Sequence, residues 1–491
     1  MSWKGAVVLV AILTIGAGLR IHWGPQLHDS GVGGDALQYF KLAVHLEREH
    51  SFSFDGKTPT WTRLPGQPLL LGAATRPSPA QTRVGTEEEQ RAGVYAFLAS
   101  CRTLGIAIEL TTALLIALLA LLLGAGHFAL LGALLWAIQP WTSIVALRPL
   151  ADAPATLLTT LCLILLLRAQ SPWGFAIAGA TAGLAQLFRP DSILLVPTIA
   201  LGAFLVRHRW RAMLAGGALW VLVFSPWPIR NLLRFGHPHP FAGGTNIALQ
   251  GQEFDRSSVM DWMRTWAASE KATVEIAWRI QGRPLPLAEL PPEAIDGPAE
   301  RAELERLLGA YAKAGHRVTD EVAQGFRTLA AERRARHPFT HWVGLPLRRV
   351  ARVLFPPWDG YGLGTLPTLI AQRTFWCILG AAVVIAGLFG LTLLLWRRAT
   401  RPMAAVLALA LLARCALLAW MPTIEARYGL EILPLLFATA VAGARRIVNG
   451  ADVVRSQQSA CTKSKRLFFA PLEDKQVKFP KATPYSGAHS D

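Results

Sequence analysis

The residues best suited to chemistry in this sequence are ionisable side chains that stand beside long apolar runs. Asp35 follows the first of these runs and opens a stretch with apolar residues at helical spacing. A carboxylate in that place can act as a general base towards an incoming hydroxyl. It can equally be the N-cap of a helix, for which Asp is a favoured residue. Asp35 is thus predicted to stand at the start of a helix, where it serves either as the N-cap or as a general base.

Eight further polar residues stand in comparable positions. They are Arg63, Asp152, Arg189, Arg230, Asn231, Glu425, Arg427 and Tyr428. Each one alone is more often a boundary residue whose side chain reaches towards water. Together they gather arginines and carboxylates on one face of a membrane, where charges usually face a cavity or a partner. Because Arg binds phosphate through a planar fork, the group favours an anionic, lipid-linked substrate.

A metal site is only weakly indicated. Asp35, Asp152 and Glu425 could share a divalent cation, but carboxylates without a fixed spacing are poor evidence for one. The sequence has no P-loop, GxSxG or HExxH motif, so nucleotide chemistry is unsupported. Its five cysteines show no CxxC or Cys/His metal spacing. No resident cofactor is predicted, apart from a possible divalent metal ion at Asp35 and Asp152.

The elements that must position these residues are membrane-spanning helices. Hydrophobic residues make up 52% of the 491-residue chain and charged residues 16%, against about 25% charged in soluble domains. A span needs about 20 mostly apolar residues. About ten candidate spans lie at 4–20, 96–123, 127–147, 150–168, 173–189, 191–206, 211–228, 373–396, 402–420 and 428–446.

The net charge of +17 reports the orientation of these spans. Arginines cluster in the short connections at 207–211 and 397–401, as the positive-inside rule expects for cytoplasmic loops. The N-terminus is then cytoplasmic, and two long loops, at 23–95 and 229–372, are extracytoplasmic. These outer loops carry nearly equal numbers of acids and bases. The basic excess is therefore a topology signal, and nucleic acid is not an expected partner.

The outer loops are expected to contain amphipathic helices, at 298–314 and 319–336. The stretch 338–355 alternates apolar residues with Arg348, Arg349 and Arg352, which is typical of a helix lying on a membrane surface. After residue 446 the hydrophobic periodicity is lost. The sequence thus predicts an all-α polytopic membrane domain at 1–446 and a disordered cytoplasmic tail at 447–491.

Several of these segments, in order and spacing, resemble motifs of bacterial GT-C glycosyltransferases. These are membrane proteins similar to dolichyl-phosphate-mannose–protein mannosyltransferases and to the lipid A aminoarabinose transferase. The segments are GDALQY at 34–39, SFSFDG at 51–56, RLPGQPL at 63–69, LFRPD at 187–191, PWPIRN at 226–231 and EARY at 425–428. The resemblance runs from about residue 5 to 446. It implies a multi-pass protein of a bacterial inner membrane.

The resemblance implies transfer of a sugar from a polyprenyl-phosphate donor to an extracytoplasmic acceptor, which is a lipid, a glycan or a protein, by an inverting displacement. Asp35 would be the base, and Arg63, Arg230 and Arg427 would hold the donor phosphate. The remaining candidates would line the substrate site: Tyr39, Asp152, Arg189, Asn231, Glu425 and Tyr428.

The sequence departs from the family pattern in two places. Ala36 stands where many relatives have a second acidic residue, which puts metal dependence in doubt. Gln67 stands where an aromatic residue is common. The alternative functions are a transporter or flippase, or a polymerase, of lipid-linked saccharides.

Overall fold

The structure of the chain is a computed structural model, and it describes most of the sequence. The described residues are 3–24, 35–75, 87–238, 246–249, 252–255, 257–268, 276–277, 279–280, 282–356 and 372–449. The chain divides into one unit from Met1 to Arg445 and a second from Arg446 to Asp491. Most of the tail predicted at 447–491 lies outside the described residues, so the prediction for it stands as made.

Among the described residues, four helices are long and apolar enough to cross a membrane. They are α1 (Trp3–Trp23), the Ala99–Leu122 part of α4 (Glu87–Leu122), α18 (Arg373–Trp396) and α19 (Arg401–Trp420). A fifth span is formed if α10 (Arg209–Phe224) and α11 (Pro226–Phe235) count as one, although the pair is bent by 43°. The bend falls at Pro226, which lacks the N–H that would continue the helical hydrogen bonding.

Other predicted spans are shorter helices in the structure. The stretch predicted as one span at 127–147 is broken into α5 (Ala129–Ile138) and α6 (Pro140–Ala146), because Pro140 starts a new helix. The next two predicted spans are α7 (Asp152–Arg168) and α8 (Pro172–Phe188). The 3₁₀-helix η4 (Pro190–Leu194) leads into α9 (Leu195–Phe204), and η10 (Ala426–Ile432) leads into a helix over 433–449.

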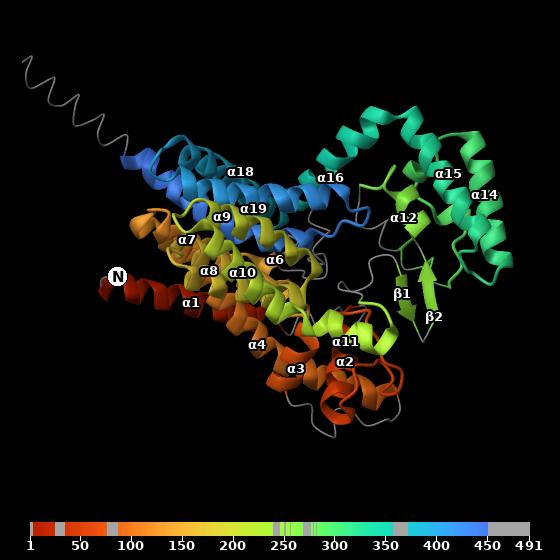
Figure 1. Cartoon of the computed structure of the whole chain (residues 1–491), viewed down its shortest axis with the longest axis horizontal. Helices are drawn as coiled ribbons and strands as arrows, with labels where there is room; N and C mark the ends of the chain where they lie inside the picture. The colour runs from red at the N-terminus through yellow and green to blue at the C-terminus, as the bar shows by residue number, and fades with distance from the viewer. Residues whose placement is uncertain are drawn as a thin grey trace, which may run out of the picture. The chain divides into compact units, whose positions relative to one another are not determined.

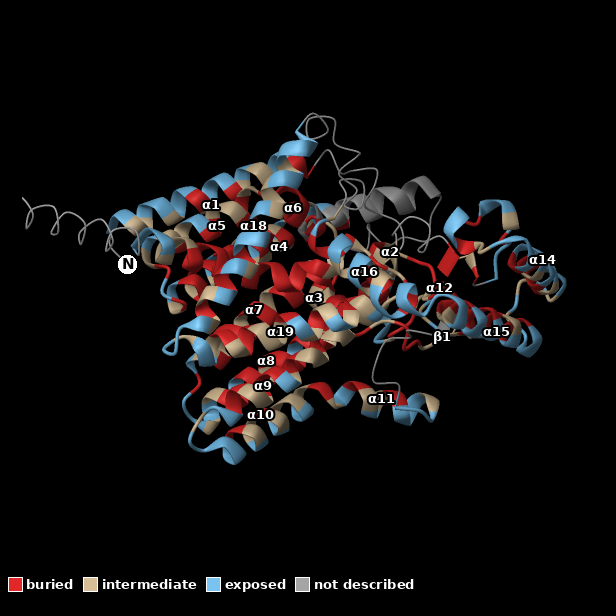
Figure 2. Cartoon of the chain, turned by 90° about the horizontal axis from the view of Figure 1, so that it is seen from above, coloured by how far each residue is buried: buried red, intermediate tan, exposed pale blue. Residues whose placement is uncertain are grey.

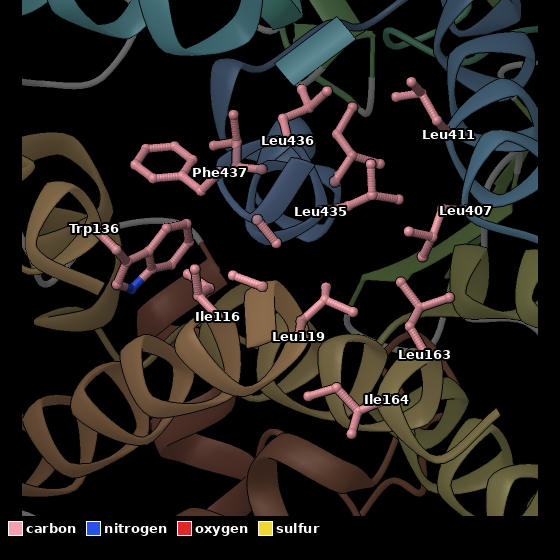
Figure 3. Packing of buried hydrophobic residues seen from close by; sticks show 14 of the residues in the cluster. Ile116, Leu119, Trp136, Leu163, Ile164, Leu407, Leu411, Leu435, Leu436 and Phe437 are labelled. Carbon is pink, nitrogen blue, oxygen red and sulfur yellow. The ribbon is translucent and has the colours of Figure 1, made fainter. Parts of the chain in front are cut away.

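The core of the helical bundle lies between α4, α5, α7, α19 and the helix over 433–449. Figure 3 shows side chains from these helices meeting in the core, among them Ile116, Leu163, Leu407 and Leu436. Trp136 packs edge-on against Phe437, with ring centroids 5.6 Å apart. Buried residues run along α7 and α8, whereas α14 is mostly exposed (Figure 2). The bundle therefore holds the ends of α7, α8 and α19 in fixed places, and the candidate residues stand at those ends.

Two short helices pack at the end of the bundle. They are α2 (Asp35–Glu49) and α3 (Gly66–Thr75). Gly66 lies so close to α8 that a Cβ on it would be 2.7 Å from the carbonyl oxygen of Leu187. This close approach is the physical reason for glycine in the Pro65-Gly66 turn, and it brings Arg63 towards the end of α8.

The described residues between 246 and 355 are mostly helical and include a hairpin. Strand β1 (Asn246–Leu249) pairs antiparallel with β2 (Gln252–Asp255), which is a small departure from the all-α prediction. Then follow α12 (Ser257–Met263), η5 (Leu287–Glu289), η6 (Pro292–Ala294), α14 (Pro298–Lys313) and α15 (Asp320–Arg336). Helices α14 and α15 run side by side (Figure 1) and form where helical spacing predicted them. Trp262 and Phe326 are central in their separate apolar core.

The last part of this stretch is a helix with an irregular start. A π-helical turn, η7 (Thr340–Gly344), runs directly into α16 (Leu345–Leu354). Helix α16 packs against the end of α19 and against η10.

Candidate active site

Segments far apart in the sequence meet around one cavity of about 440 Å³. Its ionisable lining comprises Asp35, Tyr39, Arg63, Asp152, Arg189, Asp191, Arg427 and Tyr428. Seven of these eight are predicted site residues. The rest of the lining is largely apolar and includes Leu64, Phe188, Ile193, Leu194, Leu417 and Met421. The cavity lining thus combines charged and apolar side chains.

Asp35 is held between two guanidinium groups. It is the first residue of α2, and its two carboxylate oxygens face different partners. Arg63 Nη2 donates to Oδ1, and Arg427 Nη2 donates to Oδ2 at 2.9 Å. Burial by itself would raise the pKa of Asp35, but the charges of Arg63 and Arg427 outweigh burial and hold that pKa well below its usual range. Asp35 is therefore ionised and paired on both sides.

Besides Asp35, two further residues of α2 contact Arg63. Its Nε donates to Gln38 Oε1 at 2.7 Å. Its guanidinium lies 5.5 Å from the centroid of the Tyr39 ring, within cation–π range. Burial raises the pKa of the Tyr39 phenol, so its hydroxyl stays neutral at the cavity wall.

Arg427 connects Asp35 to two more carboxylates. Its Nε lies 2.6 Å from Glu425 Oε2, and its Nη1 lies 3.6 Å from Asp152 Oδ2. Tyr428 donates its hydroxyl to Glu425 Oε1 at 2.8 Å. Glu425 does not line the cavity, but it contacts Arg427 and Tyr428, which do.

A second set of charged side chains, which alternate in sign, is connected to Arg427 through Asp152. Arg189, the residue after α8, pairs with Asp152, with Asp191 (3.0 Å) and with Glu431 (3.0 Å). Arg414 pairs with the same Asp191 and with Glu431 (3.2 Å). Two guanidinium groups and two carboxylates therefore form a closed ring, two members of which, Arg189 and Asp191, line the cavity. Asp152 joins that ring to Arg427.

Arg414 and Glu431 are not among the residues predicted from the sequence. Both are buried, and both belong to stretches predicted as spans. A charged residue in the middle of a span was the available signal, because such residues are rare and usually have a partner in the protein interior. The same two side chains line a smaller cavity of about 30 Å³, together with Thr159, Asp191 and Ser192.

Besides Glu425, two predicted site residues, Arg230 and Asn231, lie outside the cavity lining. Arg230 donates to the carbonyl of Thr60 at 2.9 Å and to Asn231 Oδ1 at 2.8 Å. Its guanidinium is also within 5.5 Å of the ring centroids of Phe52, Trp227 and Phe235. In this structure Arg230, which also donates to Asn231, therefore links α11 to the loop that carries Thr60.

The residues around Asp35 do not fit a resident metal ion. Among the residues that the structure describes, no group of three or more His, Cys, Asp or Glu side chains could hold one. Both oxygens of Asp35 face guanidinium groups, and Arg427 stands between Asp35 and Asp152. The arrangement presents cations of the protein itself, which can bind an anion once a carboxylate partner is exchanged.

Comparison with known proteins supports the fold. The sequence matches no protein-family model and no curated protein sequence. The structure resembles the oligosaccharyltransferase AglB of Archaeoglobus fulgidus, in complex with an inhibitory peptide and a dolichol-phosphate, with a TM-score of 0.50 and 15% identity. That match covers 93% of this chain, which spans about half (52%) of the archaeal protein.

The apo form of the same archaeal enzyme gives the same TM-score, 0.50, and the same 15% identity, over 94% of this chain and 53% of that one. ArnT of Cupriavidus metallidurans, bound to undecaprenyl phosphate, matches over 92% of this chain and 80% of its own, at 16% identity. Its TM-score is 0.36, so the fold assignment does not rest on it. The chain therefore shares the fold of this archaeal oligosaccharyltransferase, in agreement with the resemblance of its sequence motifs to GT-C glycosyltransferases.

Proposed function

We propose that this protein is a membrane glycosyltransferase that moves a sugar from a polyprenyl-phosphate donor to an acceptor on the extracytoplasmic side. The observation that carries the proposal is the position of Asp35 between Arg63 and Arg427, at the wall of a cavity with an apolar side. A carboxylate next to two phosphate-binding groups is what such a transfer requires. The likeness to a GT-C enzyme with a bound dolichol-phosphate points the same way.

The donor would place its lipid against the apolar residues of the cavity lining and its phosphate against the charged ones. Ile193, Leu194 and Leu417 would contact the first isoprene units. The phosphate would sit at Arg63 and Arg427, where planar guanidinium groups can form two parallel hydrogen bonds. Arg189, Asp152 and Tyr428 would complete the polar part of the cavity lining. Arg230 and Asn231 would contact the donor only after Arg230 has released the carbonyl of Thr60.

Phosphate binding changes the state of Asp35. Each guanidinium at Asp35 already has a carboxylate partner, so the phosphate must replace that partner at Arg63, at Arg427 or at both. A guanidinium that turns to phosphate stops depressing the pKa of Asp35, and the carboxylate becomes a stronger base. Donor binding would thus prepare Asp35 for the acceptor.

In the transfer step, Asp35 takes the proton of the acceptor hydroxyl. The acceptor oxygen forms a bond to the anomeric carbon, and the bond from that carbon to the phosphate oxygen breaks on the opposite side. The sugar is transferred with inversion, and polyprenyl phosphate leaves with the bonding electrons. The arginines stabilise the charge that develops on the leaving phosphate.

The ten-span topology, with a cytoplasmic N-terminus, is part of the proposal. It puts the cavity at the outer boundary of a bacterial inner membrane, within reach of lipid, glycan or protein acceptors. The basic residues at 207–211 and 397–401 would then be cytoplasmic.

The test is an assay of the purified protein in lipid nanodiscs with a panel of polyprenyl-phosphate sugars. Release of free polyprenyl phosphate from at least one donor, together with a glycosylated acceptor, is the expected result. Growth of a long saccharide would identify a polymerase. In sealed vesicles, passage of an intact lipid-linked sugar across the bilayer with no release would identify a transporter and refute the proposal.

A further inference from the structure

The segment 339–355, which we call the surface segment, has an apolar face that no described part of the chain covers. It comprises Phe339, η7, α16 and Phe355. Phe339 is 73% exposed, Trp342 59% and Leu347 65%. The segment contains no acidic residue, and two of its arginines, Arg348 and Arg352, are exposed beside the apolar face. This combination of an apolar face and flanking cations is typical of a helix in a membrane interface.

The third arginine of the surface segment points the other way. Arg349 is buried, and it donates to the carbonyls of Ala267 (2.9 Å), Arg264 (2.6 Å) and Ala419 (3.1 Å). The sequence pattern could not separate Arg349 from its neighbours. The buried guanidinium ties the segment both to the end of α12 and to the end of α19, so its exposed face has a fixed direction.

The end of α19 gives the level of this face relative to the bilayer. Helix α19 is long and apolar enough to span a membrane, and Trp420 is its last residue. Trp342 of the surface segment stacks on Trp420, with ring centroids 5.8 Å apart and planes 21° apart. Tryptophan is enriched where spans leave the hydrocarbon. The stacked pair therefore places the surface segment at the membrane–water boundary.

The inner face of the surface segment touches the chain that carries Arg427. Val353 packs with Leu418 and Ile424 in one apolar cluster. Gly429 approaches so closely that a Cβ on it would lie 2.8 Å from Val353 Cγ1. A shift of the surface segment would therefore press on Gly429 of η10, which is two residues from Arg427 in the same helix.

We propose that the surface segment binds anionic phospholipid in the outer leaflet, with Phe339, Trp342 and Leu347 among the acyl chains and Arg348 and Arg352 at the phosphates. The charge pattern and the continuity with α19 favour lipid over a second copy of this chain or another protein. Through Val353 and Gly429, the bound bilayer surface would hold η10 in place. Lipid binding itself does not depend on the proposed transferase function.

Spin labels test the location of the apolar face. Cys377, Cys415 and Cys461 are replaced, the buried Cys101 and Cys162 are kept, and one cysteine is introduced for the label. In nanodiscs with anionic lipid, a label at Leu347→Cys should be reached by oxygen far better than by a water-soluble nickel complex. A label at Phe389→Cys on α18 is the lipid-exposed control, and one at Ala302→Cys on α14 is the aqueous control.

The same label separates the possible occupants. Access by the nickel complex equal to that at residue 302 would show that the face is in water and would overturn the proposal. A label at residue 347 that neither reagent reaches would mean that protein covers the face, which also overturns it.

Charge removal tests the preference for anionic lipid. The variant Arg348→Gln/Arg352→Gln should retain several-fold less anionic phospholipid than the wild type on purification. Mass spectrometry measures the co-purified lipid. The matched variant Arg301→Gln/Arg327→Gln removes two exposed arginines of α14 and α15 and should retain the wild-type amount. Equal retention in all three proteins would refute anionic recognition. Because neither readout measures sugar transfer, failure here is distinguishable from failure of the proposed function.

Discussion

At the residue scale, the site is a set of carboxylates and arginines that neutralise one another. Asp35 pairs with two guanidinium groups, and Arg427 contacts three carboxylates. The sequence could identify Asp35, Arg63 and Arg427, because each stands beside an apolar run or a rigid turn. It could not predict their pairing, because the positions of 35 and 427 in sequence say nothing about their proximity.

The role of Arg427 is open to direct test. Arg427→Ala should weaken binding of polyprenyl phosphate roughly 10-fold to 100-fold, since hydrogen bonds to charged groups contribute about 1.5–3 kcal/mol. Arg427→Lys should restore only part of the affinity, because an ammonium group lacks the planar fork. Competition binding in nanodiscs measures both variants. Arg306→Ala, which also breaks pairs with two glutamates but on α14, is the control. Unchanged affinity in Arg427→Ala would contradict the phosphate site.

Arg63 should also set the pH dependence of the reaction. With both arginines in place, Asp35 has a depressed pKa, so the carboxylate stays charged well below the ordinary aspartate pKa of about 3.9. In Arg63→Gln, Arg427 is the remaining one of the two arginines that lower the pKa of Asp35, while burial still raises it. The pKa of Asp35 therefore rises. The acid limb of the kcat/KM profile should therefore move to higher pH.

Lys57→Gln removes an exposed positive charge from the same loop and serves as the comparison for Arg63→Gln. It should leave the limb where it is in the wild-type protein. An acid limb that does not move in Arg63→Gln would mean that Asp35 is not the group that titrates.

At the element scale, the ends of α8, α19 and α2 bring the site together. Sequence patterns predicted where many of the helices lie, and the boundary positions of the candidates followed from them. The patterns missed the ring formed by Arg189, Asp191, Arg414 and Glu431, since a single arginine in an apolar run has no visible partner in sequence. They also missed that Arg230 lies among aromatic rings and not at the cavity.

Helix α3 offers a matched pair of substitutions. Gly66→Ala puts a Cβ 2.7 Å from the Leu187 carbonyl, which must push α3 away from α8 and move Arg63. We expect a loss of about 1–3 kcal/mol in the free energy of unfolding, as for other overpacked sites. Gly72→Ala, in the same helix, meets only Ala43 O at 3.6 Å and should be neutral or stabilising. Thermal unfolding in detergent measures both, and equal midpoints would refute the close packing.

At the scale of the whole molecule, hydrophobicity and charge predicted a helical membrane protein, and the structure confirms that class. The number of spans did not follow as directly, because prolines such as Pro140 and Pro226 break or bend apolar stretches that look continuous. The charge excess still predicts the orientation, since it lies in short connections such as 397–401.

Cysteine labelling of intact cells tests this orientation. In the background without Cys377, Cys415 and Cys461, an impermeant maleimide should react with Ala302→Cys and not with Arg398→Cys, both of which are exposed positions. Permeabilised cells should label both and serve as the control. Labelling of Arg398→Cys alone in intact cells would invert the topology and place the cavity on the cytoplasmic side.

The most direct test of the account compares two aspartates of the same loop. Asp35 lies between two arginines in the cavity, whereas Asp55 is exposed and accepts the backbone N–H groups of Lys57 (2.9 Å) and Thr58 (2.7 Å). The measurement is the rate at which the purified protein releases polyprenyl phosphate from its sugar-linked donor in the presence of acceptor. We predict that Asp35→Asn loses this activity, by roughly 100-fold or more as for other general bases, while Asp55→Asn keeps it. Wild-type release by a correctly folded Asp35→Asn protein would contradict the account.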